Sequence, residues 1–95
     1  MLVINCIEKG IVIDHITAGL GARILNYLDI DTSKYTIAFI MNAESSKHGR
    51  KDVIKIKDVV DLDLTDLGLI DPTATVNIIE NHSVVRKIKL EMPEK

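Results

Sequence analysis

Cysteine and aromatic residues are scarce in this sequence. Its 95 residues include one cysteine, Cys6, no tryptophan, and only Tyr27, Tyr35 and Phe39 as aromatics. A single cysteine excludes a disulfide within the chain and cannot by itself build a zinc site. So few aromatic side chains argue against an RNA-binding domain, which stacks bases on aromatics of its sheet. We therefore expect an aliphatic, sheet-rich core of Ile, Val and Leu.

An excess of positive charge is also absent. The formal net charge is −2, with 12 Lys and Arg against 14 Asp and Glu. General nucleic-acid binding needs many cations that release counterions from the phosphate backbone, so this balance argues against a nucleic-acid partner. The basic residues are instead local, because they gather within residues 47–57 and again within residues 86–89. Such short basic stretches suit a small anionic ligand better than a polymer.

Long apolar runs are missing as well. No segment reaches the roughly 18 apolar residues of a membrane-spanning helix. The apolar residues 2–4 are interrupted by Asn5 and Glu8 before they could form the hydrophobic part of a signal peptide. We therefore expect a cytoplasmic protein with no membrane partner, and the length allows a single domain.

Apolar runs bounded by turn-forming residues predict a chain rich in strands. The runs expected to be strands are residues 2–7, 11–16, 35–41, 53–59, 74–79 and 84–90. The run Tyr35–Met41 is apolar on both sides and is expected at the centre of its sheet. Residues 42–49 are expected to form a loop, and a turn is expected around Asn81-His82-Ser83.

Two helices are expected between these strands. Apolar residues at helical spacing predict a helix to about residue 28, with Thr17 placed to cap it. Gly21 weakens its first turns, which is typical of close approach to a sheet. A shorter helix is expected within residues 61–70, ending before Pro72 because the residue before a proline avoids helical backbone angles.

Apart from the first run, this order predicts an α+β fold. Strand, helix, strand, strand, helix, strand and one further strand is the plan of a ferredoxin-like sandwich, with a mainly antiparallel sheet and two helices on one face. Residues 1–90 are expected to form this domain and residues 91–95 a tail or linker. The fold hosts many unrelated activities, so it does not decide the function.

Asp14 and His15 place an acid and an imidazole inside a predicted strand. Strand alternation would send the two side chains to opposite faces, so they are not expected to form a catalytic dyad with one another. A single short carboxylate suits a ribose, because it can accept hydrogen bonds from the sugar hydroxyls. The alternative is structural: Asp14 caps the turn before the helix, and His15 is a half-buried histidine whose hydrogen bonds are satisfied.

Lysines recur along one face of the fourth predicted strand. Lys51, Lys55 and Lys57 share that face, and Lys87 follows in the last hairpin. At about 3.3 Å per residue, Lys51 and Lys55 lie roughly 13 Å apart, which suits the two ends of a nucleoside triphosphate or two neighbouring ligands. The alternative is a solvated face whose charges protect a sheet edge from aggregation.

A small acylphosphatase-like hydrolase is a second interpretation of the same fold. It would need an arginine loop and a water-orienting asparagine, for which Arg50 and Asn77 are candidates. No glycine-rich loop that could cradle a phosphate accompanies Arg50. Asn77 is either a buried amide that needs partners or a solvent-facing residue on an edge strand. The three histidines are too scattered in the sequence to indicate a metal site.

Three stretches, taken together, resemble the regulatory chain of aspartate carbamoyltransferase. They are Val12-Ile13-Asp14-His15-Ile16, Gly49-Arg50-Lys51-Asp52-Val53-Ile54-Lys55-Ile56, and the segment 74–85 that begins Ala74-Thr75-Val76-Asn77. They follow one another in the family's order over almost the whole chain. The resemblance implies a non-catalytic allosteric domain of pyrimidine biosynthesis that binds ATP as an activator and CTP and UTP as feedback inhibitors.

The resemblance also implies where a nucleotide binds. Ile4 and Ile7, with neighbouring backbone, would contact the base, and His82 stands in the base pocket where many members have Tyr. Asp14 and Lys55 would hold the ribose. The residues implied around the phosphates are His15, Lys51, Lys87 and, through its amide, Val84. The remaining residues implied to line the pocket are Asn77 and Ile79.

Partners and cofactors follow from the same resemblance. Two such domains pair sheet edge to sheet edge in the family, so a homodimer is expected. The family continues into a second domain whose four cysteines bind zinc and which contacts the catalytic chain. Those cysteines are absent here, so no zinc or other cofactor is expected in this chain, and a catalytic-chain partner is expected only where that domain is present. The expected ligands are nucleoside triphosphates, with Mg²⁺ as a candidate companion ion.

Overall fold

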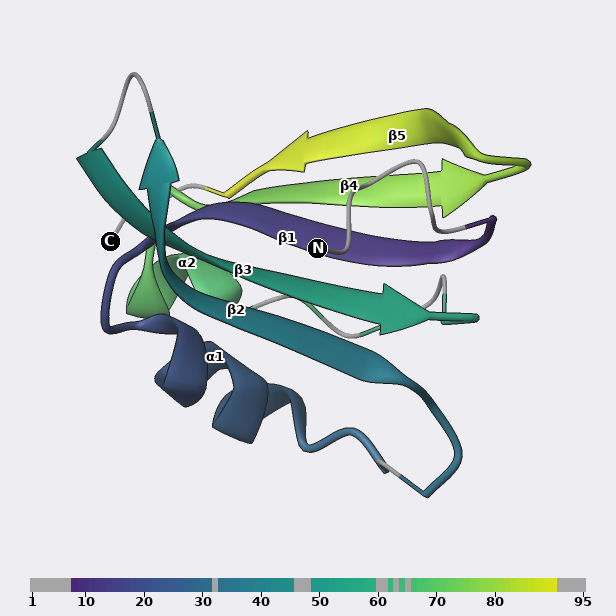
Figure 1. Ribbon diagram of the computed structural model, residues 1–95, viewed down its shortest axis with the longest axis horizontal. Helices are drawn as coiled ribbons and strands as arrows, with labels where there is room; N and C mark the ends of the chain where they lie inside the picture. Colours follow the sequence, from purple (N-terminus) through teal and green to yellow (C-terminus); the bar gives the residue numbers. More distant parts are fainter. Residues whose placement is uncertain are drawn as a thin grey trace.

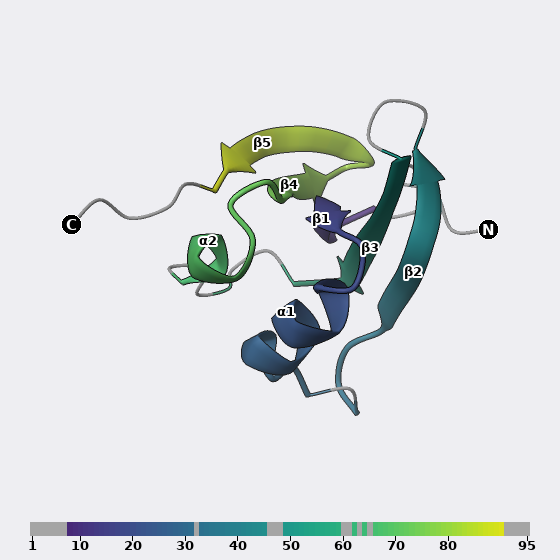
Figure 2. The same cartoon turned by 90° about the vertical axis from the view of Figure 1, so that its left-hand side faces the viewer.

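The computed structural model describes residues 8–31, 33–45, 49–59, 62, 64 and 66–90. These residues form one five-stranded sheet with two helices on one of its faces (Figures 1 and 2). The elements in chain order are β1 (Gly10–Thr17), α1 (Gly21–Leu28), β2 (Ile37–Ser45), β3 (Gly49–Lys57), α2 (Leu67–Ile70), β4 (Thr75–Glu80) and β5 (Ser83–Lys89). The predicted α+β class is confirmed.

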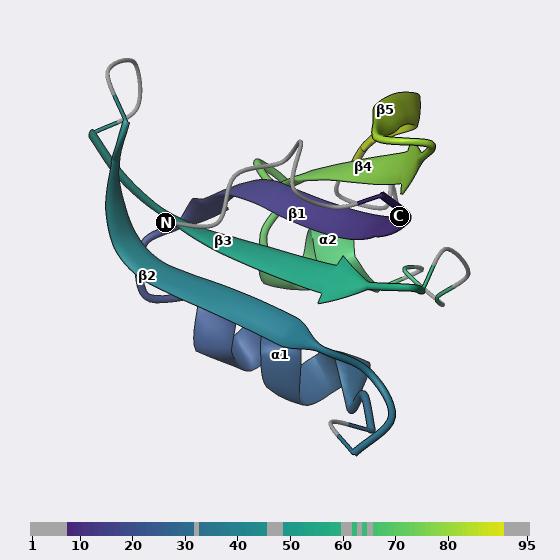
Figure 3. The same ribbon diagram turned by 45° about the vertical axis from the view of Figure 1, so that its right-hand side comes forward.

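The strands lie in the spatial order β2-β3-β1-β4-β5, and every neighbouring pair is antiparallel. The first four strands and both helices follow the ferredoxin-like plan, and β5 is added as the hairpin partner of β4. Three details of the prediction are wrong. Strand β3, expected at residues 53–59, begins at Gly49 and ends at Lys57. The strand expected at the centre, β2, lies at one edge of the sheet (Figure 3), and residues 42–45, expected in a loop, continue it.

Apolar residues gather on both faces of the sheet, which explains the error at β2. The main core lies between the sheet and the helices and includes Ile11, Ile13, Ile24, Ile54, Ile56, Leu67 and Val76. A smaller cluster on the other face consists of Val12, Val53 and Ile79, with Ile40 packed against it. On β2, Ile37 and Phe39 contact the main core while Ile40 contacts the smaller cluster. An edge strand can therefore be apolar on both sides.

Helix α1 is not capped by Thr17, which is a correction to the sequence prediction. The residue at its N-cap position makes no side-chain capping hydrogen bond. Instead, Oδ2 of Asp52 on β3 accepts hydrogen bonds from the amides of Gly19, at 3.0 Å, and Gly21, at 2.9 Å. Its Oδ1 accepts a third from the amide of Asn42, at 2.7 Å. The residue that caps α1, Asp52, is thus 31 positions from Gly21 in the sequence, so the local sequence does not indicate it.

Helix α2 is shorter than the predicted residues 61–70, and it ends as predicted. The residue before Pro72 is Asp71, whose backbone is extended at φ −153° and ψ 100°. Residues 61, 63 and 65 of the predicted helix, the first predicted strand at 2–7 and the tail at 91–95 lie outside the described residues. Neither described helix has the length and apolar character needed to cross a membrane.

Candidate functional site on the open face of the sheet

The face of the sheet opposite the helices, here called the open face because neither described helix covers it (Figure 2), carries a row of predicted site residues. In the strand register Lys55 lies opposite Val12, Val12 opposite Asn77, and Asn77 opposite Lys87. Directly opposite residues share a face, and Val12 belongs to the smaller apolar cluster. Lys55 and Lys87 therefore lie on the open face, three strand spacings or about 14 Å apart at their Cα atoms.

The lysine row differs from a simple solvated edge. Lys55 is only 6% exposed, whereas Lys87 is exposed. Asn77, between them, is 7% exposed and its amide Nδ2 donates a hydrogen bond to the carbonyl oxygen of Val12 at 3.4 Å. Of the two interpretations of Asn77, the buried amide with a partner is the correct one. The row combines one sheltered ammonium, one exposed ammonium and a fixed amide.

Ile79 and Val84 lie opposite one another on the neighbouring row. Ile79 is buried and Val84 is 48% exposed. His82 lies in the turn between β4 and β5, and its amide donates to the carbonyl oxygen of Glu8 at 3.0 Å. The two remaining predicted residues, Ile4 and Ile7, lie outside the described residues.

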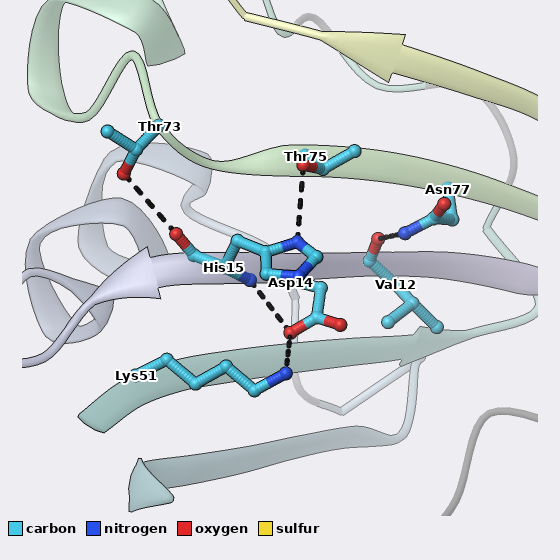
Figure 4. Close-up of polar contacts among 7 residues, drawn as sticks. All are labelled: Val12, Asp14, His15, Lys51, Thr73, Thr75 and Asn77. Atoms are coloured by element: carbon cyan, nitrogen blue, oxygen red, sulfur yellow. Dashed lines mark hydrogen bonds and ion pairs between the residues drawn. The ribbon is translucent and has the colours of Figure 1, made fainter. Parts of the chain in front are cut away.

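A β-bulge interrupts β1 at Asp14 and His15. The register with β3 shifts between Ile13 and Ile16, and both isoleucines are fully buried in the main core. Residues three apart face opposite sides of a regular strand, so the strand accommodates one extra residue here. The expected separation of Asp14 and His15 is therefore wrong: both side chains lie on the open side, beside Lys51 and Thr75 (Figure 4).

Asp14 is held by two donors that reach the same carboxylate oxygen. Lys51 Nζ lies 2.8 Å from Oδ1, and the backbone N–H of His15 donates to it at 2.7 Å (Figure 4). Burial by itself raises the pKa of Asp14, but the hydrogen bond and positive charge of Lys51 and the His15 amide outweigh it. The pKa of Asp14 lies below its ordinary value, so the carboxylate is ionised at neutral pH and can accept hydrogen bonds from ligand hydroxyls.

A hollow of about 260 Å³ adjoins this ion pair. Its lining residues are His15, Ile16, Thr17, Arg50, Lys51 and Thr73. The hollow combines cationic and hydroxyl groups, which are the side chains that hydrogen-bond to phosphate oxygens. Thr17 and Thr73 are not among the predicted site residues. Nothing in their local sequence could have indicated this role, because they come together through contacts between β1 and the segment before β4.

A larger hollow, of about 480 Å³, lies on the other side of the molecule between α1 and β2. Apolar side chains such as Leu25, Ile37 and Phe39 contribute to its lining. None of the predicted site residues lines it. The chemistry-bearing side chains, rather than the size of the cavity, therefore identify the open face as the candidate site.

The structure does not bring Arg50 and Asn77 together as a hydrolase site. Asn77 lies opposite Val12, whereas Lys51, next to Arg50, lies opposite Thr17 at the far end of β1. Along the regular strand β3, the four residues from Lys51 to Lys55 separate these rows by roughly 13 Å. Arg50 is also engaged elsewhere, because its guanidinium lies 3.5 Å from the Glu44 carboxylate.

Comparisons with known proteins agree with the resemblance seen in the sequence. A family model described as aspartate carbamoyltransferase regulatory chain, allosteric domain, matches residues 2–91. The aspartate carbamoyltransferase regulatory chain of Clostridium botulinum is 54% identical over 94 residues, covering 99% of this chain and 64% of the relative. That of Clostridium tetani is 53% identical over 96 residues, covering 100% and 67%. That of Bifidobacterium longum is 43% identical over 91 residues, covering 96% and 66%. The chain thus spans about two thirds of the length of the curated relatives it matches.

Proposed function

Since this chain belongs to the family of aspartate carbamoyltransferase regulatory chains and matches its allosteric domain, we propose that it binds nucleoside triphosphates as effectors on the open face. The relatives are named as regulatory rather than catalytic chains. The observation that supports the proposal most is the strand register. It aligns Lys55, Asn77 and Lys87 across the sheet, on the same face as the ion pair of Asp14 and Lys51.

In this proposal the ionised Asp14 accepts hydrogen bonds from the ribose, and Lys55 contributes a sheltered cation beside it. An ammonium within a largely buried surface attracts an anion more strongly than one in bulk water, because the local dielectric constant is lower. Lys51 already pairs with Asp14 at 2.8 Å. It still has further N–H donors, so it can bind a phosphate oxygen without releasing the carboxylate.

Lys87 and the hollow beside His15 supply the phosphate contacts in this proposal. Lys87 is exposed on β5 and can move to meet a flexible triphosphate. No three His, Cys, Asp or Glu side chains within the described ranges lie together as a metal site. The proposal therefore assigns Mg²⁺, where it accompanies the nucleotide, to the phosphate oxygens rather than to protein ligands.

Regulation would require that the nucleotide interacts differently with two states of the assembly. A coupling free energy of about 1 to 3 kcal/mol is typical of such effects. We propose that ATP activates and that CTP and UTP inhibit a catalytic partner chain. The chain matches about two thirds of the relatives' length, and in this proposal the remaining third of such a protein makes the contact with the catalytic chain.

We also propose a homodimer, formed through the β2 edge of the sheet. The sheet has two edges, β2 and β5. Strand β5 carries Arg86, Lys87 and Lys89, and like charges facing one another oppose pairing of two copies. The first seven residues of β2, from Ile37 to Ala43, include no charged side chain, and Met41 is 67% exposed. This uncharged part of the β2 edge is the better surface for a second copy.

The nucleotide proposal is tested by calorimetric titration with ATP, CTP and UTP, together with thermal unfolding at the same ligand concentrations. A ligand present at one hundred times its dissociation constant stabilises the folded protein by about 2.7 kcal/mol. Lys55→Met and Lys87→Ala should each weaken the response while remaining folded. Lys34→Ala, an exposed lysine between α1 and β2, is the matched control and should respond like the wild type.

Two outcomes would refute the proposal. One is a wild-type protein that responds to none of the three nucleotides. The other is full nucleotide response in both lysine variants, which would move the site away from the open face. An RNA-binding role is not supported by the same face, since Phe39 contacts the main core and Tyr27 lies on α1.

A further inference from the structure

We propose that Asp71 and Thr73, which follow α2, are positioning residues that hold the β1 bulge in place and thereby set the affinity of the open face for phosphate groups. The proposal rests on the nucleotide-binding function proposed above. It adds two residues that neither the sequence pattern nor the resemblance assigns to the site. They act through His15 and Lys51 rather than as the principal ligand contacts.

The bulge needs such support because His15 has a left-handed backbone, with φ of 57°. Residues other than glycine rarely adopt this conformation, and they keep it only where surrounding contacts over-determine it. A regular strand would place His15 on the face opposite Asp14. The bulge is therefore what brings the imidazole to the open side beside the ion pair of Asp14 and Lys51 (Figure 4).

Asp71 and Thr73 hold the bulge from the β4 side of β1, whereas Lys51 lies on the β3 side. Asp71 is 2% exposed, and its Oδ2 accepts a hydrogen bond from the Thr17 amide at 2.6 Å. Its Oδ1 accepts from the Thr73 amide at 2.9 Å and the Thr73 hydroxyl at 2.6 Å. The Thr73 hydroxyl also lies 3.3 Å from the carbonyl oxygen of His15 (Figure 4). On the other side, the His15 amide donates to Asp14. Hydrogen bonds to Asp14 and to Asp71 thus fix the backbone from His15 to Thr17.

The hydrogen bonds of the Thr73 hydroxyl can be removed by a single substitution. The hydroxyl has one proton, which points mainly to the closer acceptor, Asp71 Oδ1, with a weaker share to the carbonyl of His15. Its oxygen also lies 3.4 Å from the hydroxyl of Thr17, which can donate to it. Both threonines line the hollow beside Lys51. Valine preserves the shape of threonine but removes the hydrogen bonds of the hydroxyl.

The experiment measures binding of ATP and AMP by calorimetry in the wild type, Thr73→Val, Thr73→Ser and the control Thr36→Val. Thr36 is an exposed threonine before β2. The gain in affinity from AMP to ATP reports the contacts of the outer phosphates. One hydrogen bond corresponds to about two- to tenfold in affinity, so Thr73→Val should reduce that gain by this factor. Thr73→Ser, which keeps the hydroxyl, and Thr36→Val should retain it.

An unchanged gain from AMP to ATP in Thr73→Val would overturn the positioning role, and so would an equal loss of affinity for both nucleotides. If Thr73→Val does not fold, NMR of the wild type decides instead: the amide signals of Thr17 and Thr73 should shift more with ATP than with AMP, and identical shifts would overturn the proposal. Absence of any nucleotide binding by the wild type would refute the proposed function and this inference together. Normal binding with an unaffected Thr73→Val would refute only the inference.

Discussion

Asp52 shows how a single buried carboxylate can organise three elements at once. It lies next to Lys51 on β3, but its side chain points to the helix side, where it accepts the amides of Gly19, Gly21 and Asn42. These donors belong to the start of α1 and to β2. One strand therefore presents a structural acid on one face and a candidate ligand-binding cation on the other, as strand alternation allows.

Replacing Asp52 with alanine should be strongly destabilising. The change removes the acceptor of three amide protons at a residue that is 2% exposed. Each buried donor left without a partner costs about 1 to 3 kcal/mol, so the free energy of unfolding should fall by about 3 kcal/mol or more. Urea denaturation measures the effect. Asp66→Ala is the control, since Asp66 is exposed and makes no capping hydrogen bond to α2; equal stability of the two variants would contradict the role of Asp52.

His82 is expected to limit the stability of the β4–β5 hairpin. The turn has two central residues, Asn81 at φ 52° and His82 at φ 65°, which is the geometry of a type I′ turn. Asparagine tolerates the left-handed conformation, whereas histidine pays a steric cost of about 1 to 2 kcal/mol that glycine avoids. Glycine loses more backbone entropy on folding, by about 0.5 to 1 kcal/mol. His82→Gly should therefore raise the free energy of unfolding by a few tenths to about 1 kcal/mol.

Chemical denaturation of His82→Gly and of Ser83→Gly separates turn geometry from a general effect of glycine. Ser83 begins β5 and is not among the residues with positive φ. Glycine there should lower stability, because it adds entropy to the unfolded chain without relieving strain. A His82→Gly variant less stable than the wild type would show that the turn is not strained at this residue.

At the scale of elements, the strands were predictable because their apolar alternation is local. The turn at residues 81–83, the end of α2 before Pro72 and the lysine face of β3 are all confirmed. The bulges of β1 and β2 were not predictable. The bulge of β2 has Asn42 at φ 56° with its amide bound to Asp52, and that of β1 is followed by the Thr17 amide bound to Asp71.

The bulges of β1 and β2 are thus each held by a buried carboxylate from another part of the chain. The partner of Asn42 is 10 residues away and that of Thr17 is 54 residues away. Periodicity depends only on residues that are near one another in the sequence. It therefore predicts regular alternation through Asp14 and His15, and it predicts an end of β2 before residue 42. For the same reason the sequence does not indicate Thr17 and Thr73 as site residues, whereas Lys55 and Lys87 were indicated by the lysine pattern and lie opposite Val12 and Asn77.

Helix α1 offers a test of how closely it packs on the sheet. Glycine to alanine within a helix normally stabilises by about 1 kcal/mol. At Gly21 an added Cβ would lie 2.5 Å from Phe39 Cε1 and 2.8 Å from Asp52 Oδ2. Overpacking of this kind costs about 1 to 3 kcal/mol, so Gly21→Ala should lower the melting temperature. Asn26→Ala, on the exposed side of α1, should leave it equal or higher. A Gly21→Ala variant as stable as the wild type would contradict the close approach.

At the scale of the whole molecule, the two edges of the sheet predict how copies associate. If the uncharged β2 edge pairs with a second copy, Met41→Lys should shift the monomer–dimer equilibrium toward monomer by placing like charges opposite one another. Val85→Lys, at a residue of β5 that is 54% exposed, is the matched control and should leave the equilibrium unchanged. Light scattering over a concentration series measures both. A wild type that stays monomeric at high concentration would refute the dimer.

Acid should destabilise the molecule through Asp14 and Asp71, which lie at opposite sides of the β1 bulge. Burial raises the pKa of Asp71, but the hydrogen bonds from Thr73 and from Thr17 outweigh it, so that its pKa lies below its ordinary value, as does the pKa of Asp14. A carboxyl whose pKa is lower in the folded than in the unfolded state contributes stability above the unfolded pKa, near 3.9. That contribution is lost as the pH falls through about 4 toward the lower folded pKa.

The free energy of unfolding should therefore be nearly constant from pH 7 to pH 5 and should fall below pH 4, as measured by urea denaturation across this range. Asp71→Asn removes one of these carboxyl groups, so it should be less stable than the wild type at pH 7 and should lose less stability on acidification. The two proteins should converge at the lowest pH, where Asp71 of the wild type is protonated. Asp66→Asn, at an exposed residue that makes no capping hydrogen bond to α2, is the control and should be as stable as the wild type at pH 7. Parallel curves for Asp71→Asn and the wild type would mean that Asp71 titrates alike in the folded and unfolded chain, and that its hydrogen bonds to Thr17 and Thr73 do not stabilise the ionised form.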